Sequence, residues 1–381
     1  MASTVSNKWF WLAGLVLLGA IGTWAHYHQN ELFAQYEAWR VSRASEVERA
    51  KLVAQLAPRG TAAIAALVPY LRSTDPAARA NCGSALAELA SQWTAATEQS
   101  KELARQLVAE FGTFTASARC EALYVAAAAL TTPNDEVSPV VTATLVRLLE
   151  DVELLTAAEA RPGALLFAIR LANQASPAND SVRKACRALV GAAVHDERAE
   201  CRANAARLAA APGVELLNQV PQYIIGPKPD TDAEVRRVAI VLLGRHEELV
   251  STEQLLPSLH DVSGAVRRAC EQALRGRGLT DEQIDLARLM TDPDAAVRAQ
   301  VPAKVLSVRE VDARIWLDQL SRDSSPAVRA AVIRAFAEHP DADLRDCVRE
   351  MAANDPSCTV RQLADYYLFL HHRNDRGSAG R

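Results

Sequence analysis

The sequence predicts an all-α protein built from about nine stacked helical hairpins, with one apolar helix in front of them. Alanine accounts for 72 of the 381 residues and aromatic residues for only 5%, which favours helices packed through small side chains over a β-sheet. In addition, a Val-Arg dipeptide recurs at a nearly constant interval through the second half of the chain. Such a period is typical of repeated units, each of which completes its core against its neighbours.

The first predicted element is an uncharged segment at residues 9–27. Its sequence, WFWLAGLVLLGAIGTWAHY, contains no Lys, Arg, Asp or Glu, and as a helix it would span about 28 Å, enough to cross a bilayer. Trp9 and Trp11 lie at one end and Trp24 and Tyr27 at the other, as is typical of aromatic side chains at two membrane interfaces. We therefore expect a retained single-pass membrane helix, with a cleaved signal peptide as the alternative.

Two features bear on which side of the membrane would hold the rest of the chain. Lys8 precedes the apolar segment and favours a cytoplasmic N-terminus with an exported, periplasmic or extracytoplasmic body. The seven cysteines favour the cytoplasmic side, because they are odd in number, show no C-x-x-C spacing, and exported proteins tend to avoid free thiols. We expect the exported side and keep the cytoplasmic side as the alternative.

The predicted boundaries divide the chain into five segments. Residues 1–8 form an N-terminal tail, and residues 9–27 form the membrane helix. Residues 28–58 are expected to form a polar stalk or a capping helix, residues 60–372 the array of hairpins, and residues 373–381 a disordered tail.

An aspartate and an arginine six residues apart define the repeat. The last five arginines follow one another at intervals of 31, 31, 31 and 32 residues. Each aspartate precedes a turn and an amphipathic run, so it is expected to mark the start of the second helix of a hairpin. Between residues 97 and 175 the pattern is weaker, and the phase of the hairpins there stays open. The pairs are Asp196 and Arg202, Asp230 and Arg236, Asp261 and Arg267, Asp292 and Arg298, Asp323 and Arg329, and Asp355 and Arg361.

A helical wheel indicates what these arginines do. In the unit around Arg236, the side chains of Val235, Val238 and Leu242 fall on one buried stripe, and the arginine lies at its edge. From there its guanidinium can bind the aspartate of its own unit or of the adjacent one with two hydrogen bonds. We expect a ladder of such pairs to hold the units in register. Binding of a phosphate-bearing ligand is the less favoured alternative, since every arginine has an aspartate at a constant offset.

The pattern L-x-P-x-L followed by D-x-x-x-x-V-R-x-x-A-x-x-A-L resembles the HEAT repeat. The short period resembles the HEAT-like repeats of the phycobilisome-lyase type, and the resemblance covers about four-fifths of the chain. It implies a right-handed α-solenoid and Asp–Arg ladders between units. It also raises the question of enzymatic activity, because some HEAT-like arrays are enzymes.

Catalytic groups are not apparent in the sequence. The deoxyhypusine-hydroxylase type of HEAT-like array binds a di-iron centre through repeated His-Glu pairs, whereas here only His246 is followed by a glutamate, and His339 and His371 are not. No motif identifies a bilin pocket, a nucleophile or a phosphate-binding loop. We expect no catalytic residue, no metal and no cofactor. The alternative is an accessory subunit or modifying enzyme of the bilin-lyase or deoxyhypusine-hydroxylase-like branch.

Charge limits the kinds of partner. The chain has 42 basic and 46 acidic residues, and a net charge of −4 gives no basic excess to neutralise a phosphate backbone. We therefore expect no nucleic acid but one or more protein partners of unknown identity, in addition to the membrane at residues 9–27. The predicted function is that of a membrane-anchored scaffold or assembly factor.

The partner surface is expected on the second helices, at positions that point away from the buried stripe. Apolar side chains rimmed by charges of both signs at these positions suit an amphipathic helix or an extended peptide. Ile240 and Ile333 lie close to the buried stripe and could instead pack against the next unit. The candidate partner-binding residues are Arg237, Val241, Arg268, Glu271, Arg275, Leu306, Arg334, Tyr366 and Phe369.

Overall fold

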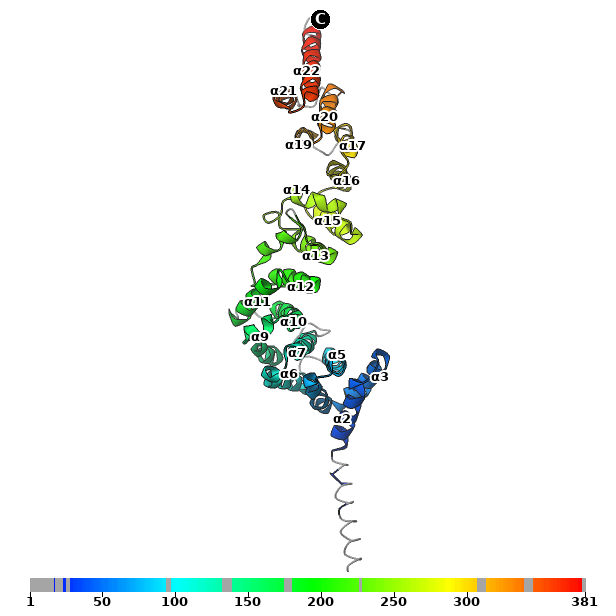
Figure 1. The fold of residues 1–381 in the computed structure, drawn as a ribbon, viewed down its shortest axis with the longest axis vertical. Coiled ribbons are helices and arrows are strands. Elements are labelled where there is room, and N and C mark those ends of the chain that lie inside the picture. The colour runs from blue at the N-terminus through cyan, green and yellow to red at the C-terminus, as the bar shows by residue number, and fades with distance from the viewer. Residues whose placement is uncertain are drawn as a thin grey trace, which may run out of the picture. The chain divides into compact units, whose positions relative to one another are not determined.

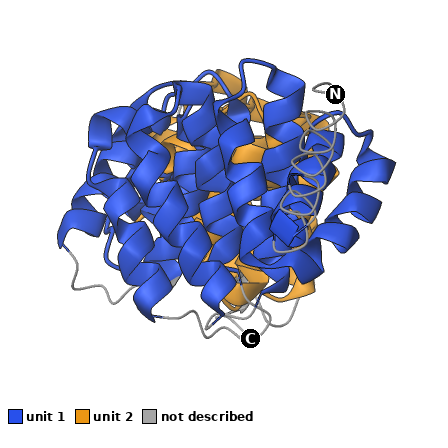
Figure 2. Cartoon of the chain, turned by 90° about the horizontal axis from the view of Figure 1, so that it is seen from below, with its two compact units in different colours: residues 1–220 blue, residues 221–381 orange. Residues whose placement is uncertain are grey.

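The computed structural model shows a helical chain (Figure 1). No strand occurs among the residues that the structure describes, so the predicted all-α class is confirmed. The chain divides into two compact units, Met1–Val220 and Pro221–Arg381, coloured blue and orange in Figure 2. The described residues are 17, 23–24, 28–93, 97–131, 139–174, 180–225, 228–306, 313–338 and 345–378.

The prediction of a single-pass membrane protein is wrong for the part of the chain that is described, where no helix is long and apolar enough to cross a membrane. Of the predicted span 9–27, only three residues are described, and the others lie outside the described residues. The helix that follows, α2 (Gln29–Ser42), carries charged residues such as Glu31 and Arg40, which make it too polar to extend an apolar span. The predicted membrane localisation is therefore contradicted by the described part of the chain.

Unit 1 consists of consecutive helices joined by short turns. Their bounds are α2 Gln29–Ser42, α3 Glu46–Leu56, η1 Ala57–Arg59, α4 Thr61–Leu67, η2 Val68–Arg72, α5 Pro76–Gln92, α6 Glu98–Glu110, η3 Phe111–Thr113, α7 Ala116–Ala129, α8 Pro139–Val146, η4 Arg147–Leu149, α9 Val152–Thr156, α10 Arg161–Gln174, α11 Asp180–Ala193, α12 Ala199–Ala209 and η5 Leu217–Gln219.

Within unit 1, helices that do not follow one another directly in the chain pack side by side. Helix α5 packs against α7, α7 against α10, and α10 against α12, while α4 packs against α6 and α6 against α8. Between these two sets of helices lie fully buried side chains such as Leu86, Leu123 and Phe167. Each pair of helices therefore completes the core of the pair before it.

Unit 2 continues the same alternation of a shorter and a longer helix. Its elements are η6 Pro221–Tyr223, α13 Ala233–Leu243, α14 Thr252–Leu255, η7 Leu256–His260, α15 Gly264–Gly276, α16 Asp281–Met290, α17 Ala295–Arg298, α18 Val301–Val305, α19 Ala313–Leu320, α20 Pro326–Glu338, α21 Arg345–Asn354 and α22 Cys358–Ser378. The longer helices again contact one another, α13 with α15, α17 and α18 with α20, and α20 with α22.

Side chains that bind the free N–H groups of the first turn fix many helix starts. Before α5, Oδ1 of Asp75 accepts a hydrogen bond from the N–H of Ala77 at 2.9 Å, and Pro76 occupies a first-turn position that needs no donor. Before α16, Thr280 and Gln283 form a reciprocal capping box. The short polar stretches between alanine-rich runs thus determine where each helix begins.

A glycine allows the closest approach between two helices of unit 1. A Cβ atom placed on Gly163 of α10 would overlap the carbonyl oxygen of Cys120 on α7, and this oxygen belongs to the backbone and cannot rotate away. Gly191 of α11 is also helical, but a Cβ atom there would meet nothing within 4 Å. The two glycines are a matched pair for testing how tightly these helices pack.

We expect Gly163→Ala to lower the free energy of unfolding by about 1–3 kcal/mol, because α7 and α10 must move apart. Gly191→Ala should raise it by roughly 0.5–1 kcal/mol, since alanine is the better helix former and has room. Urea denaturation followed by circular dichroism measures both. A gain in stability for both variants would show that the α7–α10 contact is loose.

Candidate functional site

The repeat aspartates bind backbone groups at the start of the second helices. Oδ1 of Asp230 accepts a hydrogen bond from the N–H of Asp232 at 2.8 Å, and the helix begins at Ala233. The same bond to the residue two positions ahead forms at each of the other repeat aspartates: Asp196, Asp261, Asp292, Asp323 and Asp355. The aspartate therefore shapes the turn and lies two residues before the cap, a more distant position than the sequence pattern suggested.

Each repeat arginine binds the turn of its own helical repeat. Nη1 of Arg236 donates to the carbonyl oxygens of Asp230 at 2.7 Å and of Thr231 at 3.1 Å. Arg202, Arg267, Arg298, Arg329 and Arg361 donate in the same way to the carbonyl of their own repeat aspartate. Arg79 in unit 1 binds the carbonyl of Ser73 at the same offset, at 3.1 Å. The arginine thus satisfies carbonyl groups that the turn leaves without a backbone partner.

Among the described contacts of unit 2, three repeat arginines also bind the carboxylate of the next repeat through the other side of the guanidinium. Nε and Nη2 of Arg236 lie 2.7 and 2.8 Å from the two carboxylate oxygens of Asp261. The corresponding distances are 2.8 and 2.9 Å from Arg298 to Asp323.

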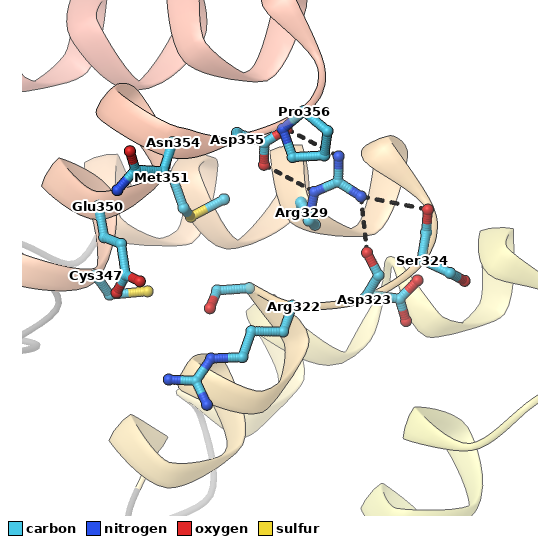
Figure 3. A pocket seen from close by; sticks show the side chains of 11 residues that line it. Arg322, Asp323, Ser324, Arg329, Cys347, Glu350, Met351, Asn354, Asp355 and Pro356 are labelled. Atoms are coloured by element: carbon cyan, nitrogen blue, oxygen red, sulfur yellow. Dashed lines mark hydrogen bonds and ion pairs between the residues drawn. The ribbon is translucent and has the colours of Figure 1, made fainter.

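The third pair, Arg329 and Asp355, is the most deeply buried (Figure 3). Both of its distances are 2.8 Å, and only 7% and 2% of the two side chains are exposed. Together, these bidentate contacts join successive helical repeats within unit 2.

The ladder is interrupted at one step. Arg267 is exposed and binds only carbonyl groups, those of Asp261 and Val262. The carboxylate of Asp292, which would be its partner, accepts only the N–H of Asp294 among the contacts of the described residues. The second helix that follows Asp292 is also the one that is divided into α17 and α18.

In unit 1 a different arginine takes the ladder position. Asp196 is bound by Arg161, at the first residue of α10, and by Arg198, whose Nε lies 3.0 Å from its Oδ1. Arg202 donates to the carbonyls of Asp196 and Glu197. The sequence pattern missed Arg161 because that residue stands at the start of its helix, three positions ahead of the usual place.

Ion pairing lowers the pKa of the ladder aspartates Asp196, Asp261, Asp323 and Asp355, and at the last two the arginine hydrogen bond is the largest cause. The hydrogen bond from Arg298 lowers the pKa of Asp323, although partial burial opposes the shift. The hydrogen bond from Arg329 likewise lowers the pKa of Asp355. Both carboxylates therefore stay ionised well into the acidic range.

A hollow of about 400 Å³ adjoins the Arg329–Asp355 pair (Figure 3). The turn from Ser321 to Ser324 lines one part of it, and Cys347, Glu350 and Asn354 of α21 line another. Because this cavity is open and its walls carry both charges, nothing about it selects a particular ligand.

The candidate partner-binding residues differ in exposure. Val241, Arg268, Arg275, Arg334, Tyr366 and Phe369 are exposed, whereas Arg237, Glu271 and Leu306 are half-buried. Ile240 and Ile333 are fully buried, so they pack within the protein. The outward face of the second helices is therefore narrower than a regular wheel predicts.

Several charged residues on this face already have partners. Arg237 binds Glu234 on its own helix, and Arg275 binds Asp281, with an Nε–Oδ1 distance of 2.7 Å. Nη2 of Arg288 lies 2.6 Å from Oε1 of Glu271. By contrast, Arg268 and Arg334 form no ion pair with any described carboxylate.

The search for metal ligands gives no cluster. Within the described ranges, no group of three His, Cys, Asp or Glu side chains could hold a metal ion. Nδ1 of His246 lies 2.8 Å from Oε1 of Glu248, so its contact is not with Glu247. His339 lies outside the described residues, and the side chain of His371 is not described.

The fold and these contacts define a helical, repeat-like all-α protein. Neither a family model nor a curated protein matches the chain. Among solved structures, it is similar to an engineered protein from the Northeast Structural Genomics Consortium, with 18% sequence identity and a TM-score of 0.45. That match covers 89% of this chain and 94% of the engineered one.

We expect Arg329→Ala to lower the free energy of unfolding of unit 2 by about 3 kcal/mol, because it leaves the buried Asp355 without a counter-charge. Arg267→Ala should cost only about 1 kcal/mol, since the exposed Arg267 binds carbonyl groups alone. Chemical denaturation combined with hydrogen exchange at α20 and α22 measures both losses.

A double-mutant cycle of Arg298→Ala and Asp323→Ala should give a loss of unfolding free energy smaller than the sum of the losses of the two single variants. Strict additivity would contradict the ladder.

The free energy of unfolding should fall in acid, because the ladder aspartates lose their charge when they are protonated. A carboxylate whose pKa is lowered by folding contributes stability above its unfolded pKa, near 3.8, and this contribution is lost as the pH falls through the folded pKa. We expect the difference in unfolding free energy between the wild type and Asp323→Asn to shrink as the pH is lowered from about 5 to about 2. Asp292→Asn is the control, and its difference should change less because no arginine of the described residues binds the Asp292 carboxylate. Parallel curves for both variants would contradict the prediction.

Proposed function

We propose that this chain is a HEAT-like, right-handed α-solenoid that serves as a non-catalytic protein-interaction scaffold or assembly factor. The succession of helix pairs in each unit supports this proposal, because such pairs complete their cores against neighbours. The bonds from Arg236 to Asp261, from Arg298 to Asp323 and from Arg329 to Asp355 support the resemblance to Asp–Arg ladders. A rigid surface of this kind suits binding of an extended or helical partner.

The observation that carries the proposal is the chemistry of the outward face on the second helices of unit 2. Val241 is 57% exposed and Phe369 is 66% exposed, so both offer apolar surface to a partner. Arg268 and Arg334 supply charges that no described carboxylate neutralises. A protein partner with apolar and acidic groups would satisfy both features, whereas a polyanion would leave the apolar side chains in water.

Three buried cysteines offer no nucleophile at neutral pH. Burial raises the pKa of the Cys82 and Cys270 thiols to about 12, and that of Cys186 to about 11. A thiol must be deprotonated to act as a nucleophile, so these three groups are unreactive at neutral pH. Their positions in the helix cores explain why cysteine is tolerated in place of alanine.

We expect the triple variant Val241→Ser, Arg268→Glu and Arg275→Glu to lower partner capture by about tenfold or more, since it changes both the apolar and the charged contacts. Affinity capture with quantitative mass spectrometry measures the loss for each co-purifying protein. The helical content and melting temperature should remain close to those of the wild type, because all three side chains are exposed.

The matched control is Val262→Ser, Arg322→Glu and Arg349→Glu, which makes the same chemical changes at other exposed positions of unit 2. This variant should retain the capture of the wild type. Equal capture by both variants would move the binding surface elsewhere, and equal loss would indicate a nonspecific effect of charge.

A further inference from the structure

An aromatic stripe runs along the outer side of α2 in unit 1. Phe33, Tyr36 and Trp39 are 52%, 57% and 44% exposed, and Leu32 is 40% exposed. The opposite side of the helix is buried through Ala34, Ala38 and Val41. The helix is therefore apolar on two sides, and only one of them is used by the fold.

The spacing of the stripe suits another helix. Leu32, Tyr36, Trp39 and Arg43 are separated by four, three and four residues, which is the spacing of a seam between two helices. Along the helix axis the stripe extends for about 16 Å, or three turns. An extended peptide would have no reason to match this period.

Three arginines cover the rings of the stripe. The guanidinium of Arg43 lies 4.6 Å from the centre of the Trp39 ring, and that of Arg40 lies 6.0 Å from the Tyr36 ring. Arg59 from η1 lies 5.0 Å from the Phe33 ring. These distances allow cation–π attraction, which holds the aromatic rings and the positive charges together on one surface.

Among the described residues the positive charge of the stripe is only partly balanced, since Glu48 attracts Arg40 without forming an ion pair. Arg59 is bound by the buried Glu37, with an Nε–Oε2 distance of 3.1 Å, whereas neither Arg40 nor Arg43 forms an ion pair with a described carboxylate. Glu31 is five residues before Tyr36, about 140° around the helix, and it binds His28. The first 27 residues of the sequence contain no Asp or Glu.

We propose that the stripe on α2 binds an acidic amphipathic helix of a partner protein, with aliphatic side chains against Tyr36 and Trp39 and carboxylates against Arg40 and Arg43. A second copy of this chain fits less well. Parallel pairing of two α2 helices would place arginine against arginine. In antiparallel pairing the exposed carboxylate of α2, that of Glu31, lies away from the stripe and binds His28, so neither arrangement supplies a free carboxylate. This site is separate from the proposed partner surface of unit 2.

Fluorescence anisotropy with the full chain and a labelled 18-residue helical peptide tests the proposal. The probe carries leucines at four- and three-residue spacing flanked by glutamates, and a matched peptide carries lysine in place of each glutamate. We expect the wild type to bind the glutamate peptide about tenfold or more tightly than the lysine peptide. Arg40→Glu with Arg43→Glu should reverse this preference, and Tyr36→Ala with Trp39→Ala should weaken binding of both peptides.

The control variant is Arg147→Glu with Lys184→Glu, which changes the charge of unit 1 by the same amount at two other exposed positions and should keep the wild-type preference. Absence of binding to the glutamate peptide, or binding without preference, would overturn the proposal. So would a wild-type dimer in sedimentation that the Tyr36 and Trp39 changes convert to a monomer. Flotation with phosphatidylcholine–phosphatidylserine vesicles that requires Arg40 and Arg43, without peptide binding, would assign the stripe to a lipid surface instead.

Discussion

The structure of unit 2 depends on arginines that each make two kinds of contact at once. The guanidinium of Arg329, for example, binds the carbonyl groups of Asp323 and Ser324 in its own turn. It also binds the carboxylate of Asp355 in the next repeat. Folding of the turn therefore places the guanidinium in position for the neighbour. Stacking of the neighbour in turn gives the buried arginine its counter-charge, so local and long-range order stabilise each other.

Much of this arrangement follows from the sequence because the residues involved recur at fixed intervals. The period locates the second helices, and the constant offset of six between Asp230 and Arg236 identifies the two groups that share a turn. The offset does not determine which aspartate each guanidinium binds, because that depends on the distance between successive repeats. Small side chains allow close approaches, such as that of Gly244 to Ala273 of α15, and at this distance Asp261 lies within reach of Arg236.

The sequence was a poorer guide where a backbone irregularity changes the spacing. Arg161 occupies the ladder position beside Asp196, although it lies at the start of α10 and outside the pattern. Arg267 has the expected position but does not reach Asp292. Burial of Ile240 is a related case, since a wheel gives the direction of a side chain but not how far the neighbouring helix extends over it. These features depend on packing between units, which a periodic pattern does not encode.

The ladder also makes the remaining charges informative. The repeat aspartates and their arginines are bound within the protein. Arg40 and Arg43 on α2, and Arg268 and Arg334 in unit 2, stand outside this ladder and form no ion pair with a described carboxylate. On α2, exposed aromatic side chains lie next to these basic groups. Keeping apolar and unpaired basic groups together in water costs free energy that a partner with acidic and apolar groups would recover. In the proposed functions, these two faces are where that free energy would be recovered.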